Sequence, residues 1–385
     1  MRSKLSDFIQ INPRETLPKG TPAKKVSMDK VQPFTRDISS FEIEAYSGGA
    51  KFRNGDTIMA RITPCLENGK TAQVRFLNDG EIGFGSTEFI VFRAIPNVTD
   101  PDYVYYLVSS PLIREPAIKS MVGSSGRQRV QNDVVENLVL PIPDISTQEK
   151  TGRILKAIDD KIYYNQQIND NLFQQLFALY DNYCNSADGR KIELGALCQF
   201  QEGYVNPAQT HPEYFDGDVK WLRAVDINES YIIETSRTLT PIGFQSAKKS
   251  AYMFSPNTIA ISKSGTIGRL GIVADYMCGN RAVINIAPKD PLLLPYIYAF
   301  LKSHQKEFPD LAVGSVQKNL YVSLLEPLPV RLLDPDALSE FCNAGNAILN
   351  AVGNNCQENI RFAQLRDTLL PRLMSGELDV SGFGF

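Results

Sequence analysis

The chain has 385 residues, 43% of them hydrophobic and 22% charged, which is typical of a soluble globular protein with room for two or more domains. No apolar run is long enough to cross a bilayer and the polar first ten residues are unlike a secretory signal, so we expect a cytoplasmic protein. Two histidines and six scattered cysteines without CxxC spacing argue against a metal site and a disulfide framework.

The net charge of −3 would argue against nucleic acid as a partner if it were spread evenly. Residues 146–184 carry four basic and five acidic side chains, and residues 334–380 carry three basic and seven acidic ones. Removing their charges of −1 and −4 leaves +2 for the rest of the chain. The sequence outside these two segments is therefore compatible with DNA binding.

The chain repeats one plan, in residues 1–185 and again in residues 190–385. Each half has an amphipathic segment, a strand with an Asp/Asn-Thr-Ile core, a helix, a Gly/Ser-rich turn and a proline-bounded strand. The matched segments are 4–13 with 193–203, 54–62 with 256–265, 100–110 with 293–303, 123–132 with 313–321, and 139–144 with 327–332. Strand-like runs mixed with isolated helices predict an α+β fold for each half.

A long helix is predicted after each α+β half. Asp144 and the capping-box pair Ser146 and Glu149 mark the start of the first helix. Asp334 followed by Pro335 marks the start of the second. The predicted division is a globular domain over 1–145, a helix over 146–187, a second globular domain over 188–333, and a helix with a C-terminal tail over 334–385.

Both helices carry side chains alternately three and four residues apart that form a coiled-coil seam with two central asparagines. The positions in the first helix are Leu155, Ile158, Ile162, Asn165, Asn169, Leu172, Leu176, Leu179 and Tyr183. A shift of 190 residues gives Gly345, Ile348, Val352, Asn355, Asn359, Phe362, Arg366, Leu369 and Leu373. An unrelated helical hairpin in each half is the alternative interpretation of this pattern.

Antiparallel packing of the two helices would place Asn165 opposite Asn359 and Asn169 opposite Asn355, so that buried asparagines fix the register at a cost in stability. The first helix would be about 58 Å long, at about 1.5 Å per residue, and such a pair would act as a spacer.

Two positions predict weaker points in this helix pair. Gly345 would lie opposite Leu179, and we expect loose packing at that end. Pro371 is expected to kink or terminate the second helix, because proline removes a helical hydrogen bond.

Motifs for catalysis are missing from the sequence. Residues 64–71 end in Gly-Lys-Thr like a phosphate-binding loop, but Pro64 stands where the first glycine belongs. There is no [DNS]-P-P-[YF] quartet, no GxGxxG after a strand, no HExxH and no GxSxG. We therefore expect a protein without a catalytic centre or a metal site of its own.

Polar side chains gather in turns at matching places in both halves and suit the reading of base edges. Arg and Lys can pair with guanine, Asn and Gln with adenine and Glu with cytosine, and the remainder can bind phosphate. The first-half candidates are Arg61, Thr63, Glu67, Asn68, Lys70, Ser86, Thr87, Glu88, Ser124, Ser125, Arg127, Gln128 and Arg129. The second-half candidates are Lys263, Ser264, Thr266, Arg269, Asn280, Arg281, Ser315, Gln317 and Lys318. For each residue taken singly, a solvated turn is the alternative.

The segments 56–70, 85–89 and 255–268 resemble target-recognition domains of type I restriction-modification specificity subunits. Segments 146–176 and 359–380 resemble the two conserved helical regions of that family, and LRDTLLPRLMSGEL at 365–378 is the most specific motif. The resemblance covers nearly the whole chain. It implies two pseudo-twofold-related α+β recognition domains separated by an antiparallel two-helix coiled coil.

The resemblance also implies a function without catalysis. Each recognition domain would read one half of a bipartite double-stranded DNA target, and the helices would set the spacing and bind two modification subunits. Those subunits would methylate adenine N6 with S-adenosylmethionine, and a restriction subunit would add ATP- and Mg-dependent translocation and cleavage. The cofactors are thus expected on partner subunits. A single-chain DNA methyltransferase or nuclease, or a coiled-coil scaffold that does not bind DNA, are the alternatives.

Overall fold

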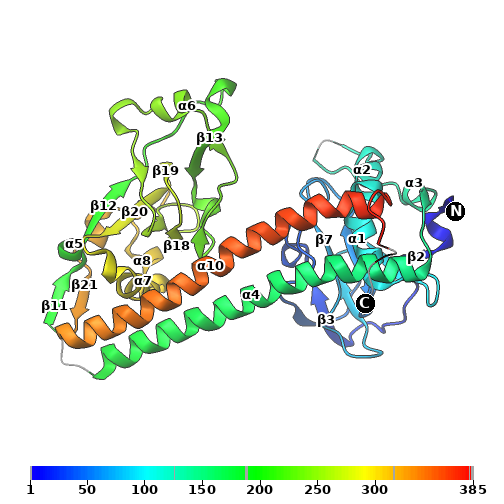
Figure 1. Cartoon of the computed structure of the whole chain (residues 1–385), viewed down its shortest axis with the longest axis horizontal. Coiled ribbons are helices and arrows are strands. Elements are labelled where there is room, and N and C mark those ends of the chain that lie inside the picture. The colour runs from blue at the N-terminus through cyan, green and yellow to red at the C-terminus, as the bar shows by residue number, and fades with distance from the viewer. Residues whose placement is uncertain (1, 125, 187–189, 315–316, 381, 383–385) are drawn as a thin grey trace. The chain divides into compact units, whose positions relative to one another are not determined.

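The computed structural model describes residues 2–124, 126–186, 190–314, 317–380 and 382, in two compact units. Unit 1 comprises residues 1–163 and 360–385, and unit 2 comprises residues 164–359. The two long helices each contribute residues to both units (Figure 1). The predicted boundary at 187–188, between the first helix and the second domain, lies outside the described residues.

Unit 1 is built on three sheets, which have the strand orders β2-β9-β6-β7, β4-β3-β8-β5 and β1-β10. The strands are β1 (Arg2–Lys4), β2 (Ile9–Ile11), β3 (Pro22–Val26), β4 (Glu42–Ala45), β5 (Lys51–Phe52), β6 (Thr57–Ala60), β7 (Thr71–Gln73), β8 (Gly83–Gly85), β9 (Phe89–Ala94) and β10 (Val139–Pro141). The helices are α1 (Pro101–Ser109), α2 (Pro111–Lys119) and α3 (Asn132–Glu136), with 3-10 turns η1 (Leu5–Asp7) and η2 (Met28–Lys30).

Unit 2 repeats this plan with sheets β12-β20-β17-β18-β14, β15-β13-β19-β16 and β11-β21. The strands are β11 (Arg190–Glu193), β12 (Cys198–Glu202), β13 (Phe215–Leu222), β14 (Tyr231–Ile232), β15 (Thr238–Leu239), β16 (Met253–Phe254), β17 (Thr258–Ser262), β18 (Leu270–Val273), β19 (Met277–Gly279), β20 (Val283–Pro288) and β21 (Pro329–Leu332). The α-helices are α5 (Leu194–Leu197), α6 (Pro241–Gln245), α7 (Leu294–Ser303), α8 (Phe308–Leu311) and α9 (Val322–Leu325). The 3-10 turns are η3 (Pro212–Tyr214), η4 (Ala224–Asp226), η5 (Lys248–Ser250), η6 (Pro291–Leu293) and η7 (Gln305–Glu307).

Apart from β14, which extends the first sheet of unit 2, the strands of the two units correspond, and this confirms the predicted duplicated α+β fold. The central strands β6 and β17 each pair antiparallel with two neighbours, β7 and β9 in unit 1 and β18 and β20 in unit 2. In the second sheet, β3 runs parallel to β8 just as β13 runs parallel to β19. Both central strands are buried along their length, as expected for β-branched and apolar runs at the middle of a sheet.

The long helices are α4 (Ile145–Ser186) and α10 (Pro335–Met374). The side chain of Asp144 accepts from the Thr147 backbone N–H at 2.9 Å, so Asp144 is the N-cap of α4 and the predicted capping box at Ser146 is wrong by two residues. Asp334 caps α10 as predicted, accepting from the Ala337 N–H at 3.0 Å. α10 ends three residues beyond Pro371.

The predicted asparagine pairs form within unit 2. Asn165 Nδ2 donates to Asn359 Oδ1 at 2.9 Å, and Asn355 Nδ2 donates to Asn169 Oδ1 at 2.8 Å. Asn165 and Asn169 are 1% and 6% exposed, so their amides are satisfied almost entirely by the partner helix. The helices are therefore antiparallel in the predicted register, and they form one pair rather than two unrelated hairpins.

The end of the helix pair near Gly345 is well packed, and the predicted loose packing is wrong. A Cβ on Gly345 would lie 2.6 Å from Pro295 Cβ of α7 and 3.2 Å from Leu176 Cδ1, so the glycine admits α7 against α10. Phe341 fills the space beyond it, with ring centroids 5.4 Å from Tyr296 and 6.1 Å from Tyr180. A third element, α7, thus supplies the apolar surface that α10 lacks at this end.

The core of unit 1 joins the sheets to the long helices. Asp100 is the N-cap of helix α1, and its side chain accepts from the Tyr103 N–H at 2.8 Å. The helix is buried from Tyr103 to Val108. Leu155 of α4 and Leu373 of α10 belong to the same buried cluster as α1. Unit 1 is therefore one packed body that includes the start of α4 and the end of α10.

Candidate nucleic-acid interface

Three polar loops predicted to read DNA are brought together in unit 1. They follow β6 (residues 61–70), follow β8 (86–88) and precede α3 (122–131). The Arg61 N–H donates to the Glu88 carbonyl at 2.9 Å, and the Val130 N–H donates to the Arg61 carbonyl at 2.9 Å. The Thr63 N–H and hydroxyl both donate to the Gln128 carbonyl, at 3.0 and 3.2 Å. Backbone hydrogen bonds therefore hold the three loops in one surface.

The central contact of this surface is an ion pair between Glu88 and Arg129. Arg129 Nε lies 3.0 Å from both carboxylate oxygens and Nη2 lies 2.6 Å from Oε1. The Arg129 hydrogen bonds hold the pKa of Glu88 below its ordinary value, and the charge of nearby Arg61 acts in the same direction. Arg61 Nη2 donates to the Val130 carbonyl at 3.2 Å, whereas its buried Nε has no hydrogen-bond partner in the described residues.

The other candidates in unit 1 divide into anchored and exposed side chains. Lys70 Nζ donates to the Met28 carbonyl at 2.8 Å, and the Ser86 hydroxyl accepts from the Glu88 N–H at 3.1 Å, so both side chains stabilise their own loops. The exposed candidates are Glu67, Asn68, Thr87, Ser124 and Arg127. Within the described part of the chain, the Arg127 guanidinium makes no hydrogen bond or ion pair. Ser125 lies outside the described residues.

Unit 2 forms the equivalent surface around Lys263, which follows β17 as Arg61 follows β6. Lys263 Nζ lies 2.9 Å from Glu202 Oε2 and 4.7 Å from the centroid of the Tyr321 ring. Its backbone N–H donates to the Ala282 carbonyl at 2.7 Å, and its carbonyl accepts from the Leu320 N–H at 2.9 Å. The loops after β17, after β19 and before α9 are thereby joined as in unit 1.

The remaining candidates of unit 2 surround this lysine. The Asn280 side chain accepts from the Ala282 N–H at 3.0 Å and so shapes its own turn. Arg269 is half-buried and Arg281 is exposed, and neither guanidinium has a hydrogen-bond or ionic partner among the described residues. The other described candidates are the half-buried Ser264 and the exposed Thr266, Gln317 and Lys318. Ser315 lies outside the described residues.

Three contributors to the unit 2 surface were not predicted. Glu202 comes from β12, and Tyr204 and Tyr321 are exposed aromatic side chains, at 48% and 39%, on the loops after β12 and before α9. Exposed aromatic rings beside basic residues are common in surfaces that bind nucleic acids or proteins. Tyr321 is the last residue of the predicted turn segment 313–321, so its position was available from the sequence, whereas the role of Glu202 was not.

Buried charges connect the sheets of unit 1 to the long helices. Arg36 is 1% exposed, and its Nη2 lies 2.7 Å from Asp160 on α4 and 2.8 Å from Asp37. Arg366 of α10 lies 2.9 Å from Asp159 of α4. These pairs fix the sheets and α10 to the same turn of α4, and the sequence pattern predicted only that Arg366 lies on the seam.

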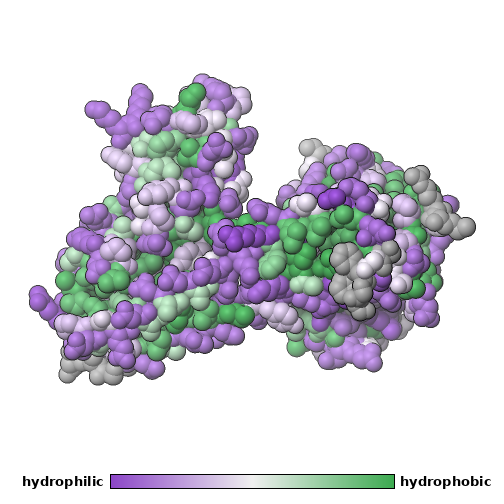
Figure 2. All heavy atoms as spheres, viewed as in Figure 1, coloured by the Kyte–Doolittle hydropathy of each residue, from purple (hydrophilic) through white to green (hydrophobic). Residues whose placement is uncertain are grey.

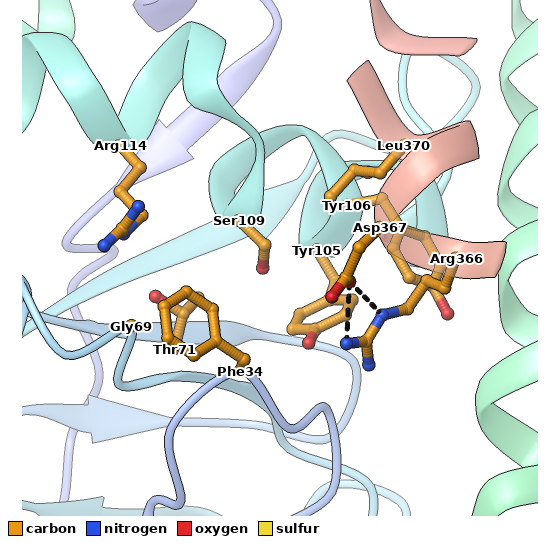
Figure 3. Close-up of a pocket in the computed structure, with 10 residues that line it drawn as sticks. All are labelled: Phe34, Gly69, Thr71, Tyr105, Tyr106, Ser109, Arg114, Arg366, Asp367 and Leu370. Carbon is orange, nitrogen blue, oxygen red and sulfur yellow. Dashed lines mark hydrogen bonds and ion pairs between the residues drawn. The ribbon is translucent and has the colours of Figure 1, made fainter. Parts of the chain in front are cut away.

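A pocket in unit 1 lies between Phe34 and the end of α10 (Figure 3). Tyr105, Ser109 and Leu370 line it, and Arg366 beside Asp367 closes one side. Its volume of about 40 Å³ admits a few water molecules.

No helix in the described residues is long and apolar enough to span a bilayer. No group of three or more His, Cys, Asp or Glu side chains in the described ranges is arranged to hold a metal ion.

Comparisons with known proteins identify the family. A family model described as the type I restriction modification DNA specificity domain matches residues 1–174 and 188–332. The specificity subunit of the type I restriction enzyme HindI from Haemophilus influenzae is 25% identical over 407 residues, which covers 85% of this chain and 87% of that protein. The specificity subunit of enzyme MjaIX from Methanocaldococcus jannaschii is 22% identical over 303 residues, covering 72% of this chain and 69% of that protein.

A solved structure of the type I restriction-modification system S subunit from M. genitalium has the same fold. It matches with a TM-score of 0.56 at 15% identity and covers 99% of this chain and 96% of that chain. The family model matches most of both units, and similarity to the HindI subunit extends over most of the chain. The chain therefore belongs to the specificity subunits of type I restriction-modification systems, which recognise DNA and are not themselves catalytic.

Proposed function

We propose that each unit of this specificity subunit reads one half of a bipartite double-stranded DNA target. The observation that carries the proposal is the duplicated scaffold with different side chains at equivalent places. Arg61 and Lys263 follow matching central strands, and Arg129 and Asn319 form matching bridges, with Val122 and Val313. Two units with similar backbone folds but different polar side chains at equivalent positions are suited to two half-sites of different sequence.

The helix pair α4–α10 would set the spacing between the two halves of the target. Both helices are continuous through residues of both units, and the buried asparagine pairs fix their register. A register fixed in this way supports a defined gap of unspecified base pairs. The gap length would then depend on the number of helical residues between the two reading surfaces.

Two modification subunits would dock on the helices, because apolar side chains remain exposed there. In unit 2, Tyr164 and Ile168 of α4 are 60% and 47% exposed. In unit 1, Leu365 of α10 is 46% exposed, and Figure 2 shows hydrophobic residues over this part of α10. Exposed apolar side chains on a helix are typical of protein interfaces.

Chemistry would reside in the partners of this cytoplasmic complex. S-adenosylmethionine is expected on the modification subunits, and ATP and Mg on a restriction subunit that performs translocation and cleavage. This division agrees with the surfaces described above, which offer base-reading and docking groups.

A domain exchange tests the two-reader model. Residues 190–330 are replaced by the matching segment of a relative with a different target, and the methylated sequence of a host expressing the chain with its modification subunits is determined. We expect one half of the target to change and the other half and the gap to stay. An unchanged target, or a change in both halves, would contradict the proposal.

A further inference from the structure

We infer that Arg129 reads a guanine in the half-site of unit 1 and that Glu88 is the residue that positions it. The inference rests on the proposed DNA-reading function and assigns a base to one side-chain pair. Three features of the pair carry it: which edge of the guanidinium is occupied, what the pair's net charge is, and how unit 2 differs at the same place.

The first feature is the geometry of the guanidinium. Glu88 engages only the edge formed by Nε and Nη2 of Arg129, at 2.6 to 3.0 Å. The opposite edge, formed by Nη1 and the second hydrogen of Nη2, makes no hydrogen bond with the described residues. That edge matches the O6 and N7 acceptors of guanine in the major groove, and the plane of the group is already fixed.

The second feature is the charge of the pair. A carboxylate beside the guanidinium cancels most of the attraction for phosphate and repels a phosphate that approaches closely. The Arg129 side chain is 46% exposed and the Glu88 side chain is 22% exposed, so both side chains remain accessible to a partner. A neutral but directional pair suits a base edge better than the DNA backbone. Glu88 can in addition accept from cytosine N4, the donor that a G·C pair presents beside guanine O6.

The surrounding side chains fit the opposite role. Arg127 stands two residues before Arg129, is exposed and has no ionic partner in the described residues. An arginine with its full charge free is suited to a phosphate, which positions the duplex without reading sequence. In this loop, Arg127 would therefore position the DNA backbone, and Arg129 would read a base.

The third feature is the absence of this pair at the matching place in unit 2. Asn319 occupies the position of Arg129, since it bridges Val313 as Arg129 bridges Val122, and its Nδ2 donates to the Gln317 carbonyl at 3.1 Å. The carboxylate of unit 2, Glu202, comes from a different strand and holds a lysine instead. The reading of a guanine by an arginine–glutamate pair is therefore assigned to one half-site alone.

The test uses the chain assembled with its modification subunits and duplexes that carry the target established by methylome sequencing. Every guanine of the unit 1 half-site is replaced, one at a time, by adenine and by 7-deazaguanine, which lacks the N7 acceptor. We expect one position at which wild type discriminates about 10- to 100-fold, the range of one bidentate contact. The variant R129K keeps the charge but replaces the planar two-pronged guanidinium with a single ammonium group, so we expect it to lose most of this preference, and 7-deazaguanine then weakens binding at that position far less.

Companion variants separate positioning from structure. E88Q is expected to lower the guanine preference while raising affinity for random-sequence DNA, because the amide releases a charged Arg129. E44Q, which removes a carboxylate of β4 paired with Lys25 of β3 in the same unit, is the matched control and should change neither quantity. R127A should weaken binding to all sequences equally and reduce the salt slope by about one.

The outcomes distinguish this inference from the proposed function. If R129K discriminates at every position as wild type does, or if the unit 1 half-site contains no G·C pair, the inference is overturned. If R129K and R127A have the same sequence-independent effect, Arg129 is a phosphate contact and the inference is again overturned. Failure of the wild-type complex to bind any bipartite target would instead remove the proposed function.

Discussion

Arg366 of α10 and Asp159 of α4 form an ion pair of 2.9 Å in unit 1, and their side chains are only 11% and 4% exposed. The Tyr106 hydroxyl of α1 donates to the second oxygen of the same carboxylate at 2.7 Å. Three helices therefore meet at one buried carboxylate, and the pair connects the helix seam to the body that carries the three candidate DNA-binding loops.

Arg366→Ala is expected to destabilise unit 1 by about 3–5 kcal/mol, because it leaves the Asp159 carboxylate buried with an incomplete set of partners. Thermal or urea unfolding of the purified chain measures the loss. The matched control is Arg372→Ala on the same helix, whose partner Glu377 is 61% exposed, and a change within about 0.5 kcal/mol is expected there. Equal losses of stability for the two substitutions would show that the buried pair with Asp159 contributes no more than the exposed pair with Glu377.

Asn355→Ala is expected to cost about 1–3 kcal/mol, since the Asn169 side-chain oxygen loses the donor that satisfies it in a nearly closed site. Urea unfolding followed by helical circular dichroism measures this loss. Gln166→Ala, on the exposed face of α4, serves as the control and should be close to neutral. A neutral Asn355→Ala would mean that the asparagine layer does not hold the two helices together.

The helix pair was predictable because its signal is local and repeated. The three-and-four spacing, the shift of 190 residues and the paired asparagines can all be read from two continuous segments. The antiparallel orientation of the helices then determines which asparagine side chains meet. Gly345 was misjudged for the opposite reason. The residue that fills the space beside it, Pro295, belongs to α7 and is separated from α10 along the sequence. The spacing of apolar residues in the two long helices cannot predict contacts that a third element such as α7 supplies.

The candidate DNA-binding loops were predicted from residue type and position, but the partners of each side chain could not be predicted. Lys70 donates to the carbonyl of Met28, 42 residues away, and Lys263 is paired with Glu202, 61 residues away. Such partners depend on how strands are ordered in the sheets. The sequence therefore predicted which turns carry polar groups, and the tertiary fold decides which of those groups are free to contact DNA.

Gly345→Ala is expected to destabilise unit 2, although alanine favours a helix over glycine by about 1 kcal/mol. The new Cβ would lie 2.6 Å from Pro295 Cβ, on a ring that cannot rotate away, and overpacking costs about 1–3 kcal/mol. Gly353→Ala on the same helix is the control, because its Cβ would lie 3.3 Å or more from the Tyr231 ring and should be neutral or stabilising. Differential scanning calorimetry should thus show a lower melting temperature for Gly345→Ala and an unchanged or higher one for Gly353→Ala.

Glu88 should titrate below its ordinary pKa of 4.5, because hydrogen bonds from Arg129 favour the carboxylate. A lowered pKa means that the pair's stabilisation is complete above about pH 4.5 and is lost as the pH falls through the lower value. Carboxyl-carbon NMR of the labelled chain measures the midpoint. In R129A the midpoint should move back toward 4.5, and a wild-type midpoint at or above 4.5 would show that the ion pair does not form in solution.

Arg269→Ala should reduce the salt dependence of DNA binding more than Lys263→Ala does. The Arg269 guanidinium has no partner among the described residues and can bind a phosphate with its full charge, and each such contact contributes about 0.9 to the slope of log K against log salt. Lys263 is already paired with Glu202, so its removal releases fewer counterions. Filter binding of the assembled complex between low and raised salt gives both slopes. Lys289→Ala is the control, because Lys289 donates to the carbonyls of Gly195 and Ala196 away from these loops. If Arg269→Ala leaves the slope at the control value, phosphate does not contact the loop after β17 through this arginine.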